Sequence, residues 1–433
     1  MNQEKKCELN PTLRFPEFRD TGDWENISFC DLLEDILDFR GRTPLKLGMK
    51  WGGGNIISLS ANNVKNGYID YDAECNLGSQ ALYEKWMGKV SVDKNDIVFT
   101  MEAPLGNALL IPDTNKYILS QRVVVFKTKK KVNNFFLIQL IWSAQFQSLI
   151  NKLATGSTAK GINQKSLKKV FVKIPSPSEQ QKIAGCLSSI DDRITAETQK
   201  LATLKAHKKG LMQQLFPAEG ETLPKLRFPE FEDAGEWVLK KFSKYIVLYR
   251  GSSPRPIQSY LTSDSSGVNW IKIGDTKFAK NFIISQVEEK ITTKGAKKSR
   301  RVNVGELILA NSMSYGKTYQ VAIDGYIYDG WFVLRDYEEY FDKQFLLQLL
   351  NSEYMQNQYK RFSAGGIVQN ISSDIVYKTV LPHTSLKEQK KIADCLSSLD
   401  ELIAAQTQAI STLKTHKKGL MQQLFPSVED VKG

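Results

Sequence analysis

One stretch of the sequence comes close to a phosphate-binding loop. Asn311-Ser-Met-Ser-Tyr-Gly316-Lys317-Thr318 follows an apolar run, and its Gly-Lys-Thr ending is the part of such a loop that would hold the phosphates of a nucleotide. The first glycine of the pattern is missing, and a comparable stretch nearer the N-terminus reads Gly106-Asn107-Ala108. We therefore predict a shared turn at both places and no nucleotide site.

The other residue types that could do chemistry form no catalytic pattern. Five cysteines include no Cys-x-x-Cys pair, and three histidines stand too far apart for a zinc cluster. The sequence also lacks the Asn-Pro-Pro-Tyr or Asp-Pro-Pro-Tyr stretch of an amino-methyltransferase, a glycine-rich cofactor loop and a His-Glu-x-x-His motif. We expect no enzyme, no bound metal or cofactor, and cysteines that remain free thiols.

The location expected for the chain is the cytoplasm. The first residues are polar and lack the apolar core of a signal peptide, and the longest apolar stretch, around Phe135–Trp142, is far shorter than the roughly 18 residues of a spanning helix. Free thiols fit the same reducing compartment. We expect no membrane partner.

The net charge points to a polyanion. Lysine and arginine number 59 against 47 acidic residues, which gives a net charge of +12 and a pI near 9.2. Such an excess favours nucleic acid, because counterions released from the phosphates drive the binding. Arginine, asparagine and glutamine suit the edges of guanine and adenine, whereas lysines mostly hold phosphates. The alternative is a basic protein without such a partner.

Loops bounded by glycine and proline carry the residues that could make these contacts. Two such loops are Gly41-Arg-Thr-Pro44 and Gly251-Ser-Ser-Pro254, and the stretch from Lys294 to Arg301 holds five basic residues in eight positions. The candidate DNA-binding residues are Arg40, Arg42, Lys46, Asn62, Asn63, Lys65, Lys160, Asn163, Arg250, Arg255, Lys277, Lys297, Lys298, Arg300, Lys317 and Asn370.

Two copies of one pattern must position these residues. Leu13-Arg-Phe-Pro-Glu-Phe18 returns as Leu226-Arg-Phe-Pro-Glu-Phe231, and a Gly-acid-Trp step follows in each copy. Residues 179–217 return as residues 388–426 with 28 identities in 39 positions, and the eleven residues from His207 recur letter for letter from His416. A period of about 210 residues indicates a duplicated domain, because solenoid units run only 20–50 residues.

Between these repeated segments the two copies have diverged. Short apolar runs predict strands, and apolar residues at helical spacing predict helices. The expected strands are Val123–Phe126, Val170–Ile174, Glu306–Ala310 and Val376–Leu381, and the expected helices are Phe135–Leu153 and Phe341–Phe362. We predict an α+β fold in which each half is a domain of mixed short strands and helices followed by a long helix. The near-identical helices would have the same function in both halves, and the diverged domains would have two different functions.

The two long helices carry a coiled-coil seam. Capping-box spacings of Ser178 with Gln181 and of Ser385 with Glu388 predict where they begin, and a Phe-Pro stop ends each after roughly 37 residues, or about 55 Å. Apolar residues recur at alternating steps of four and three. The central seam positions are Ile190, Ile194, Glu197, Leu201, Leu204 and Lys208 in the first helix and Leu399, Ile403, Gln406, Ile410, Leu413 and Lys417 in the second.

An antiparallel pairing about a pseudo-twofold axis requires that the numbers of facing positions add up to a constant. A constant of 614 sets Glu197 against Lys417 and Lys208 against Gln406, and it buries no like-charged pair. We predict this register, with shifts of seven in the constant as competitors. The alternative is that each helix packs on its own domain or on another chain.

A glycine interrupts each long helix at the same place in the repeat. Gly210 and Gly419 cost about 1 kcal/mol each relative to alanine. The close approach of another backbone would explain why both copies have them, and a fraying last turn is the alternative. The lysines around these glycines lie near the C-terminal end of each helix, where positive charge stabilises the helix dipole. That structural role is at least as good an explanation for them as contact with nucleic acid.

These features together resemble the specificity subunit of type I restriction-modification enzymes. The resemblance rests on two diverged domains with a Leu-Arg-Phe-Pro-Glu-Phe lead-in. Each is followed by a helix that opens with Glu-Gln-x-Lys-Ile-Ala and closes with Gly-Leu-Met-Gln-Gln-Leu-Phe-Pro. It covers nearly the whole chain. It implies target-recognition domains at residues 1–177 and 218–384, spacer helices at residues 178–217 and 385–426, and a tail at residues 427–433.

In that family each target-recognition domain reads one half of a split, asymmetric DNA site, and the helices space the readers and dock two methyltransferase (M) subunits. The resemblance therefore implies double-stranded DNA, two M subunits and restriction motor-nuclease subunits as partners. S-adenosylmethionine, ATP and Mg²⁺ would be bound by those partner subunits. This chain would only determine which DNA sequence the complex binds.

Two other functions remain open on the sequence alone. The chain could be a coiled-coil scaffold that joins two protein-binding domains, which absent or salt-insensitive DNA binding by the assembled complex would favour. It could also be a complete enzyme with an unrecognised active site, which methylation or cleavage by the chain alone would establish.

Overall fold

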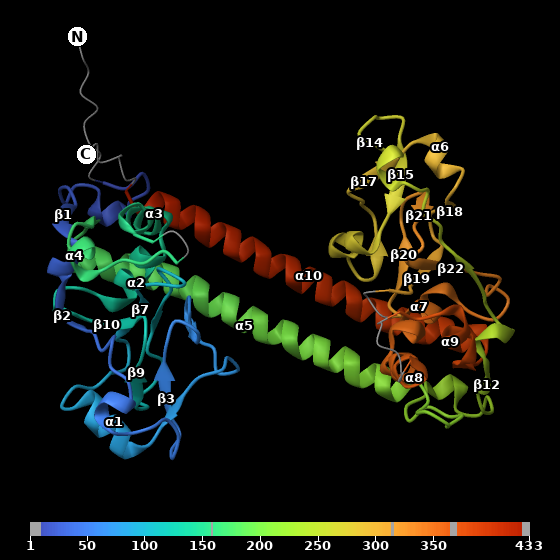
Figure 1. Cartoon of the computed structure of the whole chain (residues 1–433), viewed down its shortest axis with the longest axis horizontal. Helices are drawn as coiled ribbons and strands as arrows, with labels where there is room; N and C mark the ends of the chain where they lie inside the picture. Colours follow the sequence, from blue (N-terminus) through green and yellow to red (C-terminus); the bar gives the residue numbers. More distant parts are fainter. Residues whose placement is uncertain (1–9, 157–158, 313–315, 364–369, 427–433) are drawn as a thin grey trace, which may run out of the picture. The chain divides into compact units, whose positions relative to one another are not determined.

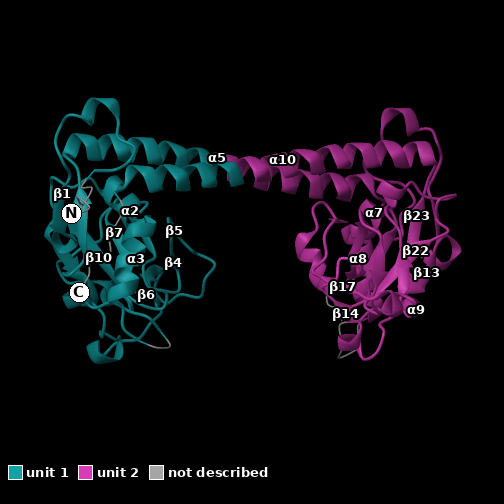
Figure 2. Cartoon of the chain, turned by 90° about the horizontal axis from the view of Figure 1, so that it is seen from above, with its two compact units in different colours: residues 1–196, 411–433 teal, residues 197–410 magenta. Residues whose placement is uncertain are grey.

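A computed structural model describes residues 10–156, 159–312, 316–363 and 370–426. The chain divides into two compact units, one of Met1–Ala196 with Ser411–Gly433 and the other of Glu197–Ile410 (Figure 2). The boundary between the units cuts through both long helices, α5 (Pro177–Leu215) and α10 (Leu386–Leu424). Each unit therefore contains a piece of each long helix.

The first unit is built from short strands and four short helices (Figure 1). The strands are β1 (Glu25–Ser28), β2 (Leu33–Leu37), β3 (Ile56–Leu59), β4 (Val64–Lys65), β5 (Tyr68–Ile69), β6 (Leu77–Gly78), β7 (Ile97–Thr100), β8 (Ala108–Leu110), β9 (Tyr117–Leu119), β10 (Val123–Thr128) and β11 (Phe171–Ile174). The helices are α1 (Gln80–Met87), α2 (Asn134–Trp142), α3 (Ala144–Leu153) and α4 (Gln164–Leu167). The main sheet has the antiparallel order β2-β10-β7-β8, and a second sheet, β6-β3-β9, pairs β3 with β9 in parallel.

The second unit has the same plan with larger sheets. Its strands are β12 (Val238–Lys241), β13 (Val247–Arg250), β14 (Leu261–Thr262), β15 (Val268–Ile271), β16 (Ile283–Ile284), β17 (Glu289–Ile291), β18 (Arg300–Val302), β19 (Leu307–Ala310), β20 (Thr318–Val321), β21 (Gly325–Ile327), β22 (Trp331–Arg335) and β23 (Val380–His383). Its helices are α6 (Thr293–Ala296), α7 (Lys343–Asn351), α8 (Glu353–Ser363) and α9 (Ser373–Lys378). The sheet orders are β13-β22-β19-β20-β16 and β14-β17-β15-β21-β18, and β15 pairs with β21 in parallel.

Most of the predicted elements are present, with two corrections. The strands predicted at residues 123–126, 170–174 and 306–310 are β10, β11 and β19. The run Val376–Leu381 was predicted wholly as a strand, which is wrong, because its first residues end helix α9 and only the last join β23. Each of the two predicted longer helices is broken in the middle by a serine, Ser143 or Ser352, whose hydroxyl accepts a hydrogen bond from the backbone of the following helix.

The long helices begin at a serine cap in both copies. Ser385 accepts a hydrogen bond from the Glu388 backbone at 3.3 Å, as its spacing predicts. In the first copy the cap is Ser176, which accepts from the Glu179 backbone at 3.4 Å, and the prediction that Ser178 fills this role is wrong. Ser178 lies inside the helix, because Pro177 already occupies its first turn.

The repeated lead-in segments clamp the first turn of each long helix. Arg14 donates two hydrogen bonds to the carboxylate of Glu179, at 2.8 and 2.7 Å, and the indole of Trp24 donates to the same carboxylate at 3.3 Å. The side chain of Glu179 is only 1% exposed. The hydrogen bonds that Arg14 donates to Glu179 raise the pKa of the Arg14 guanidinium. The Leu-Arg-Phe-Pro-Glu-Phe and Gly-acid-Trp motifs thus belong to one buried cluster.

The second unit repeats this clamp. Arg227 donates to both oxygens of Glu388 at 2.7 and 2.9 Å, and Trp237 donates to the same carboxylate at 3.3 Å. Glu388 is again 1% exposed. Two segments separated by about 160 residues are therefore joined by the same buried ion pair in each unit, which explains why both motifs recur.

The Leu-Phe-Pro ends of the helices lie in hydrophobic cores. In the second unit, Leu215 at the end of α5 and Phe216 just after it are buried in the core with Phe345, and the centres of the two phenyl rings are 5.5 Å apart. In the first unit, Leu424 at the end of α10 and Phe425 just after it are buried in the same way. Each core thus contains the start of one long helix and the end of the other, which accounts for the apolar residues that close both repeats.

The two long helices run antiparallel within each unit, as predicted. In the second unit, Gln406 donates to Glu197 at 2.6 Å, and Lys208 forms an ion pair with Asp400 at 2.6 Å. In the first unit, the ion pair is between Lys417 and Asp191, at 2.7 Å. The seam positions are buried or half-buried in both helices.

The register predicted from the apolar seam is wrong. Lys208 faces Asp400 instead of Gln406, and positions 208 and 400 add up to 608, as do positions 191 and 417. This value lies next to 607, the competing register shifted by seven from the predicted constant of 614. Asp191 and Asp400 stand just outside the apolar stripe, so apolar periodicity does not reveal that these carboxylates pair with the buried lysines.

Candidate nucleic-acid interface

A polar groove of about 710 Å³ lies on the first unit. Its walls come from the Gly41–Pro44 loop, the segment after β3 and the turn between β9 and β10. Three of the sequence candidates line it, namely Arg42, Asn62 and Lys65. Gln121 and Arg122, which were not among the sequence candidates, line the groove from the β9–β10 turn.

Most of the candidates around this groove are held by the protein itself. Arg42 donates to the carbonyl of Trp86, and its guanidinium lies 4.4 Å from the centre of the Phe39 ring. Lys46 donates to the carbonyl of Gly41 at 2.8 Å, and Asn62 donates to a backbone carbonyl at 2.6 Å. These three residues hold the shape of the loops, while Lys65 is half-buried on the groove wall.

Arg40 forms a short-range ion pair beside the same loop. Its guanidinium donates to both oxygens of Asp38 at 2.9 and 2.6 Å. Burial pushes the pKa of Asp38 up, but the hydrogen bonds from Arg40 and Gln164 outweigh it and leave that pKa below its usual value. The guanidinium of Arg40 is therefore already paired with a carboxylate before any contact with DNA.

Two asparagine candidates have structural roles. Asn63 is fully buried; its side chain accepts from the Ser60 backbone at 2.8 Å and donates to the Ser58 carbonyl at 3.0 Å. Asn163 caps helix α4 by accepting from the backbone of Ser166 at 2.8 Å. The assignment of Asn63 to DNA contact is corrected, since its amide is inaccessible. Lys160, in the loop before Asn163, is exposed.

Two adjoining grooves occupy the second unit. One of about 460 Å³ is lined by the candidates Arg250 and Asn370, and the other, of about 730 Å³, is lined by Arg255. Tyr328 lines both, and it belongs to the turn between β21 and β22. In that turn, Asp329 lies 3.6 Å from the guanidinium of Arg255.

The remaining candidates of the second unit lie on its outer face. Lys297, Lys298 and Arg300 are exposed, and Arg300 donates to the carbonyl of Arg250 at 3.3 Å, so these two arginines are neighbours. The Lys298 ammonium bonds the hydroxyl of Tyr260 at 2.6 Å. Lys277 is separate from this group and forms an ion pair with Glu288.

The stretch that resembles a phosphate-binding loop is a strand connection. Lys317 and Thr318 lead directly into strand β20, whereas a phosphate-binding loop would open a helix. Lys317 is half-buried, and burial together with the charge of Lys360 lowers its pKa. Residues 313–315 lie outside the described residues. The same connection joins β7 to β8 in the first unit, as the shared-turn prediction requires.

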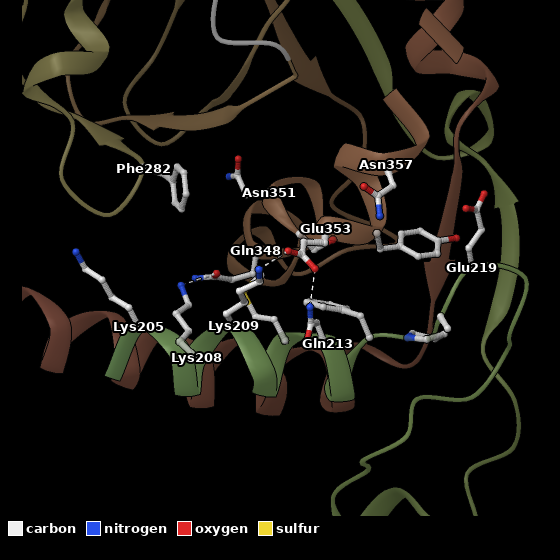
Figure 3. Close-up of a pocket in the computed structure, with 16 residues that line it drawn as sticks. Lys205, Lys208, Lys209, Gln213, Glu219, Phe282, Gln348, Asn351, Glu353 and Asn357 are labelled. Atoms are coloured by element: carbon white, nitrogen blue, oxygen red, sulfur yellow. Dashed lines mark hydrogen bonds and ion pairs between the residues drawn. The ribbon is translucent and has the colours of Figure 1, made fainter. Parts of the chain in front are cut away.

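A second surface lies where the long helices meet each unit. In the second unit, Lys208 bonds Gln348 of α7 at 3.0 Å (Figure 3). Lys208 also bonds Asp400, and Gln348 bonds the same carboxylate at 2.8 Å. Beside this triad, α5, α7 and α8 line a mainly apolar cavity of about 600 Å³, with Met212, Phe282 and other side chains on its walls. Lys205 and Lys209 extend along the helix side of the cavity (Figure 3).

The first unit repeats the triad. Lys417 of α10 bonds both oxygens of Asp191 at 2.7 Å, and Gln139 of α2 donates to the same carboxylate at 2.9 Å. The Lys417 ammonium also lies 5.0 Å from the ring centre of Trp142, a residue with no counterpart in the other triad. Each triad ties the two long helices to a helix of the recognition domain.

The residues in the described ranges contain no group of three or more His, Cys, Asp and Glu side chains placed to hold a metal ion. Within the same ranges, no helix combines the length and the apolar character that crossing a membrane requires. The four cysteines that the structure describes are unpaired. The candidate binding surfaces are the grooves of the two units and the junctions of the long helices with the domains.

The two units are copies of one α+β domain, and they have polar grooves of different composition and a shared pair of antiparallel helices. This arrangement defines a duplicated binding protein. Residues 22–206 and 248–415 match the family described as the type I restriction modification DNA specificity domain. The match spans well over half of the chain, which belongs to this family. It is the DNA specificity subunit of a type I restriction-modification system, a non-catalytic component of such an enzyme.

Several known proteins are similar along the whole chain. The type I restriction enzyme MjaVIII specificity subunit of Methanocaldococcus jannaschii is 24% identical over 431 residues, covering 95% of this chain and 93% of that protein. The putative MjaX specificity subunit of the same organism is 23% identical over 412 residues, covering 93% of both chains. In both alignments the similarity includes the two domains and the two helices.

Solved structures share the fold. The S subunit of a type I restriction-modification system from M. genitalium has a TM-score of 0.56 and 15% identity, over 97% of this chain and all of that one. A chain from a structure of type I R-M complex assembly and conformational transition has a TM-score of 0.58 and 17% identity, over 93% of this chain and 97% of that one. At these identities the likeness establishes the fold and nothing finer.

Proposed function

We propose that each unit reads one half of a split, asymmetric DNA site, so that the chain determines the DNA sequence that a type I restriction-modification complex recognises. One observation carries the proposal: the two units share a framework down to individual hydrogen bonds, yet their grooves carry different polar side chains. Identical readers would recognise a symmetric site. Readers that differ only in their grooves would recognise two different half-sites.

We assign the reading to the target-recognition domains at residues 1–177 and 218–384. The candidates whose side chains are exposed or half-buried are suited to it, and their arginine and amide side chains fit base edges while their lysines fit phosphates. The retained candidates are Arg40, Arg42, Lys46, Asn62, Lys65, Lys160, Asn163, Arg250, Arg255, Lys277, Lys297, Lys298, Arg300, Lys317 and Asn370.

We assign spacing to the helices at residues 178–217 and 385–426. A helix of 39 residues, the length of α5 and of α10, is about 58 Å long. That length corresponds to roughly 17 base-pair steps at 3.4 Å each, so a rigid helix pair would leave an unread gap between the half-sites. Residues 427–433 form a tail that lies outside the described residues.

The repeated ends of the helices would dock two methyltransferase subunits. An ideal Cβ added to Gly210 or Gly419 meets no described atom within 4 Å outside the helix itself, so packing within the chain does not require either glycine. Helix α5 continues to Leu215, which is buried, so Gly210 is not part of a fraying end. A glycine that weakens a helix and faces open space in both copies fits the close approach of a partner's backbone.

The proposed partners are double-stranded DNA, two methyltransferase subunits and restriction motor-nuclease subunits. S-adenosylmethionine, ATP and Mg²⁺ would be bound by those subunits, and this chain would contribute binding and positioning alone. The DNA contacts of a basic chain should weaken steeply with salt, because each phosphate contact releases a counterion. A scaffold without DNA specificity would show no such dependence.

The test is a genome-wide map of methylated adenines in cells that contain the cognate methyltransferase subunit, with and without this chain. We expect a split, asymmetric motif that appears only when the chain is present. Exchanging residues 24–174 for those of a relative should change one half of the motif only. Inserting a heptad into both long helices should widen the gap or abolish recognition. No new methylation, with both proteins shown to be present and associated, would favour the scaffold function instead.

A further inference from the structure

One turn occupies the same place in both units. It is Ser120–Arg122 between β9 and β10 in the first unit, and Tyr328–Gly330 between β21 and β22 in the second. The backbone of Met101 donates to the Arg122 carbonyl at 2.8 Å, and the backbone of Asn311 donates to the Gly330 carbonyl at 3.0 Å. The two turns are thus equivalent, and each lines a groove.

The side chains on this turn have opposite charges. Arg122 in the first unit lies 3.4 Å from Glu102, and the two side chains are 49% and 46% exposed. Asp329 in the second unit instead faces Arg255, which comes from the loop after β13. In both units the charge on the turn meets one opposite charge from a neighbouring loop. Exposed pairs of this kind add little to stability, so their partners are free to exchange.

The backbone at Arg122 has a conformation that its side chain does not favour. Its φ is +69°, in the left-handed region where residues other than glycine are uncommon. Ala103, which lines the same groove, has a φ of +42°. Non-glycine residues in this region persist only where the surrounding structure holds them, and they cluster at functional sites.

Arg122 differs from the other polar side chains of the groove in what holds it. Arg42 and Asn62 are bonded to backbone carbonyls, so their donors already serve the fold. The partner of Arg122 is an exposed carboxylate from the β7–β8 loop, and half of the arginine side chain faces solvent. A guanidinium held loosely at a groove wall is suited to two parallel hydrogen bonds with the O6 and N7 atoms of guanine.

We infer that Arg122 is a specificity-determining residue of the first domain: its guanidinium reads a guanine in its half-site, and Glu102 holds the side chain ready when DNA is absent. The inference rests on the proposed function, since it assumes that the first domain reads one half-site. The equivalent turn of the second domain has Gly330 at the position of Arg122 and the acidic Asp329 one residue before it, so this turn would contact a different base.

The experiment is the adenine methylation map of cells with the cognate methyltransferase subunit and variants of the full chain. Arg122→Gly removes the guanidinium and suits the left-handed backbone, and Arg122→Lys keeps the charge without the paired donors. The control is Arg19→Gln, which changes an exposed arginine of the same unit that does not line the groove. The probe is the set of genomic sites itself, so no DNA target has to be known beforehand.

We expect both Arg122 variants to relax one guanine position of one half-site by roughly 5- to 150-fold, with the other half-site and the gap unchanged. Arg19→Gln should leave the motif intact. An unchanged motif in both variants would overturn the inference. So would an even loss of methylation without relaxation at any position, because that is the behaviour of a phosphate contact. Absence of a split motif with the wild-type chain would instead refute the proposed function.

Discussion

At the first turn of each long helix the two units use the same three side chains, whereas at the groove turn they use side chains of opposite charge. Arg14, Glu179 and Trp24 have counterparts of the same residue type in the second unit, with hydrogen bonds of 2.7–3.3 Å in both. Arg122 and Asp329 occupy one turn of the framework with opposite sign. Identity at the junctions maintains one framework, and divergence at the turn gives the two grooves different charges.

The two regions also differ in how firmly their charges are held. The carboxylates at the helix junctions are buried and each receives three hydrogen bonds from its arginine and tryptophan, so replacing one partner leaves an uncompensated charge in the interior. The charged pairs at the groove turn are exposed and long, so substitution there costs little stability. Sequence change is therefore tolerated where DNA would be read and penalised where the helices are anchored.

The largest effect should come from the buried clamps. Arg14→Met leaves the Glu179 carboxylate buried without its cation, and Arg227→Met does the same to Glu388. Each change should lower the free energy of unfolding of its unit by about 3–5 kcal/mol, measured by urea denaturation. Equal losses would confirm that the two clamps do the same work.

Matched controls come from the neighbouring surface. Lys182→Met breaks an exposed pair with Glu17, and Lys391→Met breaks the equivalent pair with Glu230. Both should change the unfolding free energy far less than the clamp variants do, since all four side chains are roughly half exposed. The comparison between buried and exposed pairs fails if a control costs as much as the clamp of its own unit.

Removing the lysine of each triad should cost less stability than the clamp variants, and the cost should differ between the two units. Lys208→Met leaves Asp400, which is 16% exposed, with Gln348 alone, and should destabilise the second unit by about 1–3 kcal/mol. Lys417→Met leaves Asp191, which is 36% exposed and better hydrated, so the first unit should lose less. Calorimetry on the two variants measures the difference. A larger loss for Lys417→Met would show that burial of the carboxylate does not decide the cost.

Replacing the repeated glycines should raise the stability of the chain and weaken its assembly with the methyltransferase subunits. Gly210→Ala together with Gly419→Ala should strengthen the isolated chain by about 1 kcal/mol for each helix, because alanine is the better helix former and its Cβ meets open space. The same variant should bind the methyltransferase subunits more weakly, as measured by analytical ultracentrifugation of the mixed subunits. A docked backbone would leave no room for the added methyl groups.

A third helical glycine provides the control for that experiment. Gly185 also faces open space in α5, but the other copy has Asp394 at the equivalent position. Gly185→Ala should stabilise the helix and leave assembly unchanged. Weaker assembly with Gly185→Ala, or full assembly with the double variant, would argue against docking at the repeated glycines.

Much of the fold could be predicted because the duplication supplies its own comparison. The repeated Leu-Arg-Phe-Pro-Glu-Phe lead-in and the paired seams are strong signals, and both belong to buried structure. The helix register was missed because it is decided by Asp191 and Asp400, two carboxylates beside the apolar stripe that pair with lysines across it. Periodicity alone describes the stripe and says nothing of charges at its edge.

The candidate site was less predictable. Asn63 and Asn163 looked like base-reading amides, but the same amide chemistry suits turns and helix caps, and the fold uses it there. Arg122 was missed because one arginine between two strands has no spacing pattern; only its left-handed backbone and its place in the groove distinguish it. Residues that act singly from loops need tertiary structure to be found.

The smallest difference between the units should appear in their response to acid. His383 of β23 is half-buried among Tyr245, Tyr340 and Phe341, and burial, with a smaller effect of Lys240, lowers its pKa below the usual 6.5. The unfolded chain then binds the proton more readily, so the stability contributed by neutral His383 is complete above pH 6.5 and is lost as the pH falls towards the folded pKa.

The first unit has Ile174 at the equivalent position of β11, so it lacks this dependence. Lowering the pH from about 7.5 to about 5.5 should therefore weaken the second unit slightly relative to the first, because its unfolded chain takes up the proton more readily than folded His383. Urea denaturation at both pH values, with His383→Phe as the comparison, isolates this contribution, because phenylalanine keeps an aromatic ring against Tyr245 and cannot take up a proton. An acid response that survives in His383→Phe would have to come from other groups, and the histidine would then be only a packing residue of the second unit.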